Sequence, residues 1–143
     1  MKVDFYHLTG APVEAVLPRI AERLLEERGR LLVVTEDDAL AARIDAQLWS
    51  WKPESFIPHG RDDAPAQPVL IAASPEPANG ARNIALADGI WRDAALGYDR
   101  AFHFFGDDLI EEARAAWRAL GGREDVERRF WKQDEAGRWS QVA

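Results

Sequence analysis

Three consecutive carboxylates, Glu36, Asp37 and Asp38, directly follow the apolar run Leu31 to Val34. Such a run is typical of a strand buried on both faces, and ligands often bind where parallel strands end. Three carboxylates at that place could hold Mg²⁺. The same residues could instead occupy the first turn of a helix, where the helix dipole favours negative charge. We favour this second interpretation, because Thr35 with Asp38 resembles a capping box.

The remaining residue types give no catalytic pattern. His7, His59 and His103 lack the short spacing of metal-binding histidine pairs. The chain has no cysteine, which excludes disulfides, thiolate metal sites and cysteine nucleophiles. It has no G-x-S-x-G nucleophile elbow, and Gly10 is the only glycine in the turn "TGAPVE", where a nucleotide-binding loop would need several. The sequence therefore predicts no catalytic residue, no metal and no cofactor.

A cationic helical stripe is the first candidate for binding. Ile110, Arg114 and Arg118 are spaced four residues apart, so they share one face of a helix, with Trp117 beside them. Such a face could bind an acidic peptide, because guanidinium groups pair with carboxylates in a two-pronged geometry. Arg128 could extend the patch. The alternative, which spacing alone favours, is a solvated face balanced by neighbouring glutamates, with Trp117 in the core.

The segment "LWSWKPESFIPHG" (48–60) is the second candidate. It holds two tryptophans, a phenylalanine and two prolines but only two formal charges. Trp51 fits the apolar stripe of the preceding helix, whereas Trp49 lies off that stripe and is harder to bury. Phe56 stands in an extended run that Pro58 closes, and prolines lower the entropy lost when a partner docks. The residues leave open whether this segment is a docking surface or a buried connector.

The elements that position these residues follow from hydrophobic periodicity. Alternation predicts a strand over 2–8, and helical spacing predicts a helix over 13–28. Pro18 either kinks that helix or marks its start. The other predicted elements are strands at 31–34, 68–73, 83–88 and 98–105, helices from Thr35 to Pro53 and over 109–120 with Asp107 and Asp108 as caps, and a terminal hairpin with its turn at 134–137.

This order of elements predicts an α/β fold. We expect a single domain over 1–143, with three layers in a Rossmann-like arrangement, a largely parallel central sheet and helices on both faces. A formal net charge of −7 argues against broad, non-specific phosphate binding. The start "MKVDFYHL" lacks the apolar stretch of a signal peptide or membrane span, so a cytoplasmic location is expected.

The block "LWSWKPESFIPHG" closely resembles the LW…P-x-SF-x-PH block of the chi subunit family of bacterial DNA polymerase III. Further segments agree in the same order: "DFYHL", "GRLLVVTEDDALAARIDAQLW", "QPVLIA", "YDRAFHFF", "ARAAWRAL" and "DEAGRW". The resemblance covers essentially the whole chain, and its central block is the specific part. It implies a nucleotide-binding type of fold that uses no nucleotide, in a non-catalytic accessory subunit of the clamp-loader assembly.

The resemblance also implies partners. Chi proteins bind the acidic, phenylalanine-terminated C-terminal tail of single-stranded-DNA-binding protein, and they bind the small psi subunit, which ties them to the clamp loader. Contact with DNA is then mainly indirect, and no membrane is involved. The tail-binding set implied by position is Arg114, Trp49 and Trp117, with Arg43, Arg118 and Arg128 as further cations. The psi or partner set is Phe56, Trp51, Pro58 and His59.

Two positions depart from the family pattern. Ile110 stands where some members carry lysine, and Gly121 replaces a possible basic residue. The departures imply a weaker tail site, or one that borrows Arg43, Arg118 or Arg128. Two other functions stay open: a small α/β enzyme with a Mg²⁺ site at Glu36–Asp38, and a chi-like adaptor for a helicase or repair partner.

Overall fold

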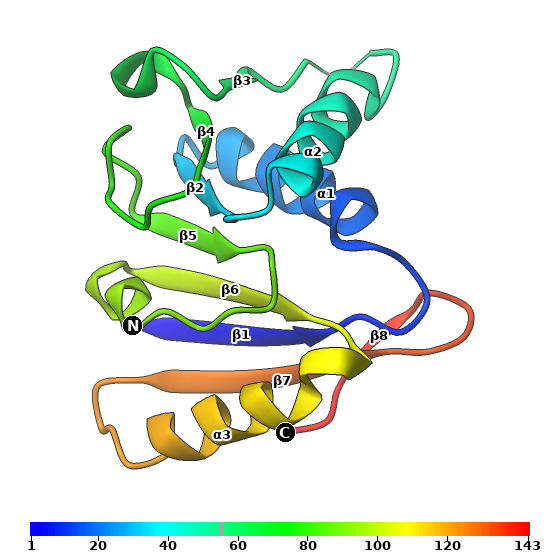
Figure 1. The fold of residues 1–143 in the computed structure, drawn as a ribbon, viewed down its shortest axis with the longest axis vertical. Helices are drawn as coiled ribbons and strands as arrows, with labels where there is room; N and C mark the ends of the chain where they lie inside the picture. Colours follow the sequence, from blue (N-terminus) through cyan, green and yellow to red (C-terminus); the bar gives the residue numbers. More distant parts are fainter. Residues whose placement is uncertain (55) are drawn as a thin grey trace.

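The computed structural model, which describes residues 1–54 and 56–143, is built on one eight-stranded sheet (Figure 1). The strand order is β3-β4-β2-β5-β6-β1-β7-β8, parallel throughout except for the β7–β8 pair. The predicted α/β class with a mostly parallel sheet is therefore confirmed.

The strands are β1 (Lys2–His7), β2 (Leu31–Val34), β3 (His59–Gly60), β4 (Val69–Ala72), β5 (Asn83–Leu86), β6 (Arg100–Phe105), β7 (Glu127–Gln133) and β8 (Trp139–Gln141). The α-helices are α1 (Val13–Glu26), α2 (Asp38–Ser50) and α3 (Ile110–Leu120). Short 3-10 turns lie at Ala64–Ala66, Asp93–Gly97 and Asp107–Leu109. No helix in the described part of the chain is both long and apolar enough to cross a membrane.

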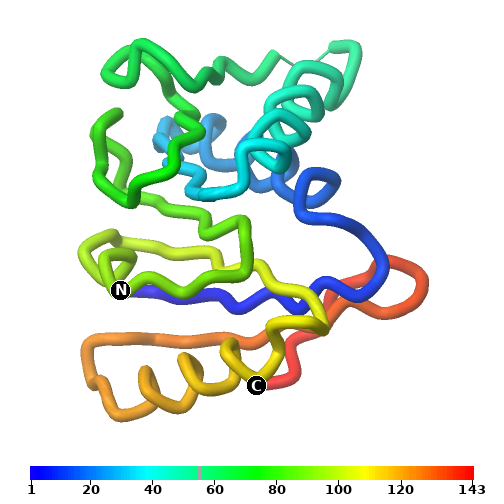
Figure 2. The backbone as a smooth tube through the Cα atoms, in the orientation of Figure 1, coloured from blue at the N-terminus to red at the C-terminus, as the bar shows by residue number. Residues whose placement is uncertain are grey.

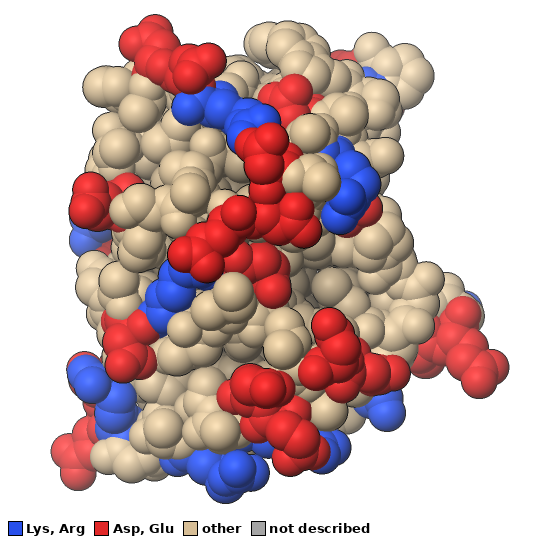
Figure 3. Space-filling view, viewed as in Figure 1, with Lys and Arg blue, Asp and Glu red and all other residues tan. Residues whose placement is uncertain are grey.

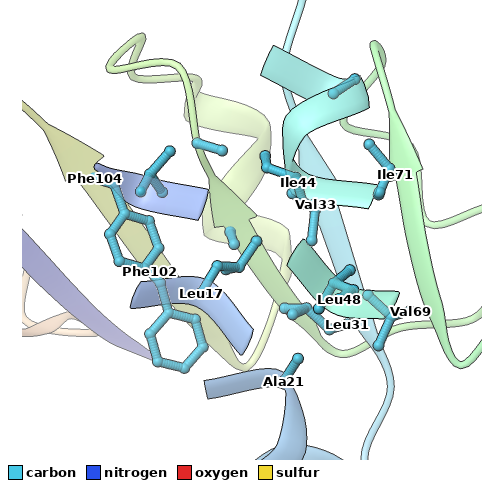
Figure 4. Close-up of a cluster of buried hydrophobic side chains, with 14 of the residues drawn as sticks. Leu17, Ala21, Leu31, Val33, Ile44, Leu48, Val69, Ile71, Phe102 and Phe104 are labelled. Atoms are coloured by element: carbon cyan, nitrogen blue, oxygen red, sulfur yellow. The ribbon is translucent and has the colours of Figure 1, made fainter. Parts of the chain in front are cut away.

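Two hydrophobic clusters lie on the two faces of the sheet, because neighbouring strand residues point to opposite sides. Phe102 and Phe104 of β6 belong to the cluster under α1 and α2, whereas Ala101 and Phe105 belong to the cluster under α3. Figure 4 shows the first cluster, in which two helices pack on the strands. Its labelled residues are Leu17, Ala21, Leu31, Val33, Ile44, Leu48, Val69, Ile71, Phe102 and Phe104. The sheet is thus the middle layer of three.

The helices cover the sheet unequally. On the first face, α1 and α2 pack on the strands from β4 to β6, and α2 also contacts β3. On the second face, α3 packs over β1 and β7 through Trp117. Figure 2 shows both chain termini in the half of the molecule that holds β1, β7 and α3. On the first face, a pocket remains between α1 and the strands β1, β6, β7 and β8.

Two of the three helix starts differ from the predictions. Helix α1 begins at Val13, as its spacing predicted, and runs through Pro18, so Pro18 does not mark its start. The N-cap of α2 is Asp37, whose side chain accepts a hydrogen bond from the Leu40 N–H at 3.2 Å; the predicted Thr35 cap was wrong.

Helix α3 has no side-chain cap. A 3-10 turn that starts at Asp107 leads into it, so the predicted Asp107 and Asp108 caps were wrong. Instead, Asp107 Oδ1 lies 2.5 Å from His7 Nε2. The two-residue strand β3 was not predicted, because two residues are too few for a periodic pattern.

Candidate functional site

An exposed aromatic patch lies where α2 ends and the connector to β3 begins. The side chains of Trp49 and Phe56 are 61% and 71% exposed, and their ring centroids are 6.0 Å apart. They are the two most exposed large apolar side chains of the described residues. Trp49 lies off the buried stripe of α2, which carries Ile44 and Leu48. Adjacent exposed aromatic rings are characteristic of protein interfaces. We call Trp49 and Phe56 the connector surface.

Buried His59 supports the connector surface from below. Its ring meets the Trp49 ring edge to face at 4.8 Å. Its Nδ1–H donates to the Ile57 carbonyl, with 2.6 Å between the two heavy atoms, and Ile57 is buried in the core. His59 Nε2 lies 3.2 Å from a carboxylate oxygen of Asp45, but not in hydrogen-bond geometry. His59 therefore holds the connector against α2 rather than presenting itself to a partner.

The other residues of the predicted partner set are less exposed than Phe56. Trp51 is half-buried against the α1 and α2 cluster, and Lys52 Nζ lies 5.4 Å from the centroid of its ring. Pro58 is half-buried as well. Ser55 of the quoted block lies outside the described residues. Only Phe56 of the set combines an apolar ring with high exposure.

A second candidate surface lies on α3. Arg114 and Arg118 are exposed on this helix. Arg114 Nη1 lies 3.0 Å from Glu111 Oε1, one turn before it. Arg118 forms no ion pair within 1–54 and 56–143. In the view of Figure 3, Lys and Arg side chains gather along the lower edge, where Figure 1 places α3. We call Arg114 and Arg118 the α3 surface.

Trp117, which the sequence left between surface and core, packs inward. Its ring lies edge to face with Phe5 at 5.4 Å and with Phe130 at 5.5 Å. The Arg128 guanidinium lies 3.9 Å from the centroid of the Trp117 ring, and its Nη1 donates to the Trp117 carbonyl oxygen. Trp117 and Arg128 thus join α3 to β7.

The two departures from the family pattern have structural explanations. Ile110 is half-buried and packs against the cluster under α3. At Gly121, whose φ of −62° is ordinary, an added Cβ would lie 2.8 Å from Arg128 Nη2. The lack of a side chain at Gly121 therefore leaves the space that the Arg128 guanidinium occupies.

The structure does not bring the whole tail-binding set together. Arg114, Trp117, Arg118 and Arg128 lie around α3 and β7. Trp49 lies on α2, next to Phe56 of the connector, and α2 packs on the other face of the sheet and near its other end. Arg43 also lies on α2, where its Nε is 3.2 Å from Glu14 Oε1 of α1. Sequence alone could not reveal this separation, because it arises from the strand order.

A family model described as DNA polymerase III chi subunit, HolC, matches residues 1–125. The chain belongs to the chi subunit family. A DNA polymerase III subunit chi from Pseudomonas aeruginosa is 34% identical over 83 residues, which are 54% of this chain and 58% of that protein. The Escherichia coli K12 protein of the same name is 29% identical over 113 residues, 75% of this chain and 77% of that protein.

The family is a non-catalytic accessory subunit of DNA polymerase III, associated with its holoenzyme and with DNA replication. This agrees with the expectation that the chain is not an enzyme. The matched range includes the connector surface and all of α3, whereas Arg128 and the β7–β8 hairpin follow it.

The carboxylate residues Glu36, Asp37 and Asp38 that follow β2 take part in structural contacts. Asp37 caps α2, and Asp38 forms an ion pair with Arg61. Asp38 and Arg61 help to line a pocket of about 470 Å³, together with Glu36 and Asp62. Three carboxylates against one guanidinium would repel a phosphate group. Within the described residues, no cluster of three His, Cys, Asp or Glu side chains is placed to hold a metal ion.

A buried polar group lies on the α3 side of the sheet. His103 of β6 is fully buried between aromatic rings, including Phe5 and Trp91, and neither ring nitrogen has a hydrogen-bond partner in 1–54 or 56–143. Burial lowers the pKa of His103 to about 4, so the ring is neutral at pH 7. Close by, hydrogen bonds from Arg92 hold the pKa of Asp88 below its usual value, although burial opposes this. His103 is part of the core.

Proposed function

We propose that the chain is a non-catalytic adaptor that links single-stranded-DNA-binding protein to the bacterial replicase in the cytoplasm. The observation that carries this proposal is the separation of the two surfaces. The connector surface and the α3 surface lie on opposite faces of the sheet and toward opposite ends of it. Two partners could therefore be bound at once, as linkage requires.

The connector surface suits a folded protein partner, for which we propose the psi subunit of the clamp loader. Burying the rings of Trp49 and Phe56 would remove apolar area from water. Exposed aromatic residues that become buried are the usual sites of large binding energy. His59 and Ile57 hold the segment in place beforehand, which lowers the entropy lost on docking.

The α3 surface suits an acidic peptide, for which we propose the C-terminal tail of single-stranded-DNA-binding protein. Arg114 and Arg118 are one turn apart and exposed, so both can pair with carboxylates. A tail held in this way brings DNA to the chain through another protein. Mainly indirect contact with DNA is in keeping with the net charge of −7.

A fluorescence titration with the tail peptide of the host's single-stranded-DNA-binding protein tests the tail assignment. We expect micromolar binding, about −8 kcal/mol, that weakens with salt and needs the terminal phenylalanine. Arg114→Glu should weaken binding about tenfold, since it replaces attraction with repulsion. Arg43→Glu makes the same charge change on α2 and should change affinity less than about twofold. Equal losses in both variants would remove the α3 surface from the proposal.

A second experiment tests linkage. The affinity for the tail peptide is measured with and without saturating psi or clamp-loader complex. Separate surfaces predict the same affinity in both cases, and competition would contradict the adaptor arrangement. The class of partner is identified by comparing the proteins that co-purify with the Phe56→Ala variant and with the unchanged chain. If the variant loses a helicase rather than clamp-loader subunits, the helicase or repair alternative is favoured.

A further inference from the structure

An arginine- and aromatic-lined pocket of about 330 Å³ lies between α1 and the C-terminal hairpin, apart from both surfaces. It forms because α1 and α2 leave this side of β1, β7 and β8 partly uncovered. The lining contributes rings from β1, β6, β7 and β8 and cations from α1, β6 and β7. The hairpin side of the pocket lies beyond residue 125, outside the range that matches the chi family.

The floor of the pocket is a row of nearly coplanar aromatic rings. Tyr6 of β1 lies between Phe102 of β6 and Trp131 of β7, with centroid separations of 6.3 and 6.4 Å and interplanar angles of 23° and 12°. Trp139 of β8 stands almost perpendicular to Tyr6, at 84° and 5.2 Å. A flat floor with an upright wall suits a planar aromatic group, which can stack on one and meet the edge of the other.

Buried Asp4 fixes two of the arginines over this floor. Its side chain is fully buried and accepts hydrogen bonds from Arg129 Nε at 2.8 Å, Arg100 Nη2 at 3.1 Å and Trp131 Nε1 at 3.0 Å. The Arg100 guanidinium lies 4.6 Å from the ring centroid of Phe102. One carboxylate thus balances only one of these two charges, and the pair keeps a net positive potential.

The rim adds two cations that the protein does not neutralise. Arg19 and Arg23 are exposed, one turn apart on α1, and their guanidinium groups form no ion pair or hydrogen bond within the described chain. Side chains at this spacing reach the same point above a helix. Burial raises the pKa of the Tyr6 hydroxyl to about 12, so this group stays a proton donor. No acidic side chain is among the described residues that line the pocket.

We propose that this pocket binds a nucleotide unit, with an aromatic base over Tyr6 and Trp139 and a phosphate between Arg19 and Arg23. Guanidinium groups recognise phosphate oxygens by paired hydrogen bonds, and stacking on aromatic side chains holds bases without selecting their sequence. The lining of this pocket is positively charged although the whole chain carries −7, so the pocket can attract a phosphate locally. A free nucleotide and one residue of a single strand share this chemistry.

The test is fluorescence titration of the full chain with adenosine monophosphate and, separately, with a short single-stranded oligothymidylate. The variants are the double change R19E/R23E and Trp139→Ala, each of which should weaken binding at least tenfold. For the oligonucleotide, losing this phosphate contact should also reduce the slope of log K against log salt by about 0.7. The matched controls on the proposed surfaces, R114E/R118E and Trp49→Ala, should change nucleotide affinity less than about twofold.

Each outcome bears on the pocket alone. Binding of the mononucleotide by itself identifies a free nucleotide as the ligand, and binding only of the oligonucleotide identifies a strand; both support the pocket. No binding of either probe, or equal losses in R114E/R118E, would overturn the proposal. So would a tail peptide whose binding R19E/R23E abolishes while R114E/R118E leaves it intact, because the pocket would then be a peptide site.

Discussion

Trp49 and Trp117 are both helical tryptophans, but they lie in contrasting environments. Trp49 lies in the last turn of α2, is 61% exposed and lies next to exposed Phe56. Trp117 lies on α3 between Phe5 and Phe130, and the guanidinium of Arg128 lies over its ring. One end of the molecule thus presents apolar rings to solvent, and the other uses its tryptophan for packing and presents arginines.

The contrast teaches that the two ends would bind by different forces. Binding at the connector surface would be stabilised mainly by burial of apolar area, which salt affects little. Binding at the α3 surface would come from charge pairs, which salt weakens because the Debye length is only about 10 Å at 0.1 M salt. The following substitutions test this contrast, starting with the largest expected effect.

Replacing each of the two tryptophans should give the largest difference in the free energy of unfolding. Trp117→Ala should lower the free energy of unfolding by about 3 kcal/mol, because it removes a packed ring from between α3 and β7. Trp49→Ala should lower it by less than about 1 kcal/mol, since the ring is mostly in water. Urea unfolding followed by circular dichroism measures both. Similar losses in the two variants would contradict the contrast.

Acid should destabilise the α3 side through His103. Its folded pKa of about 4 lies below the unfolded value of about 6.5, so the unfolded chain binds the extra proton first. This contribution to stability is complete above pH 6.5 and is lost as the pH falls toward 4, by at most about 3 kcal/mol.

Unfolding free energies of the unchanged chain and of His103→Leu, measured from pH 7 to 4, check the His103 prediction. The variant sacrifices no hydrogen bond that the described residues show. The slope of its unfolding free energy against pH should be smaller by the equivalent of about one bound proton. An unchanged slope would assign the acid sensitivity to other groups.

Phe56→Ala should weaken binding of the clamp-loader partner by about 2 kcal/mol, roughly thirtyfold, without lowering stability measurably. The same loss should appear at low and at high salt. Ile90→Ala is the matched control, since Ile90 is another exposed apolar side chain away from the connector. Isothermal titration calorimetry at two salt concentrations measures both variants, and a loss that salt removes would point to charge rather than burial.

The smallest expected effect is a difference in stability between substitutions at two neighbouring glycines. Gly121→Ala should push the Arg128 guanidinium off the Trp117 ring and cost about 1 kcal/mol of stability, the size of one cation–π contact. At Gly122 the nearest atom to an added Cβ is 3.9 Å away, so Gly122→Ala should cost nothing or stabilise slightly. Equal effects in thermal unfolding would show that Arg128 is not held by this space.

Local pattern predicted most of the fold. The unbroken apolar run of β2, the alternation in β1 and the spacing in α1 each place their elements to within about two residues. Helix starts were less predictable, because several neighbouring polar residues could each act as the N-cap. For α2 the sequence predicted Thr35, whereas Asp37 accepts the capping hydrogen bond. Family membership followed from the specific block around Trp49 and Phe56, which the matching range contains.

The sequence by itself determined the α/β class, most of the elements and the membership of the chi family, because these depend on local periodicity and on residues close together in the chain. Only the tertiary structure decided that Trp49 belongs with Phe56 and not with Arg114, because strand order sets which helices share a face. It also decided the arginine and aromatic pocket. Tyr6, Phe102 and Trp131 are far apart in sequence, and they become neighbours only when β1 pairs with β6 and β7.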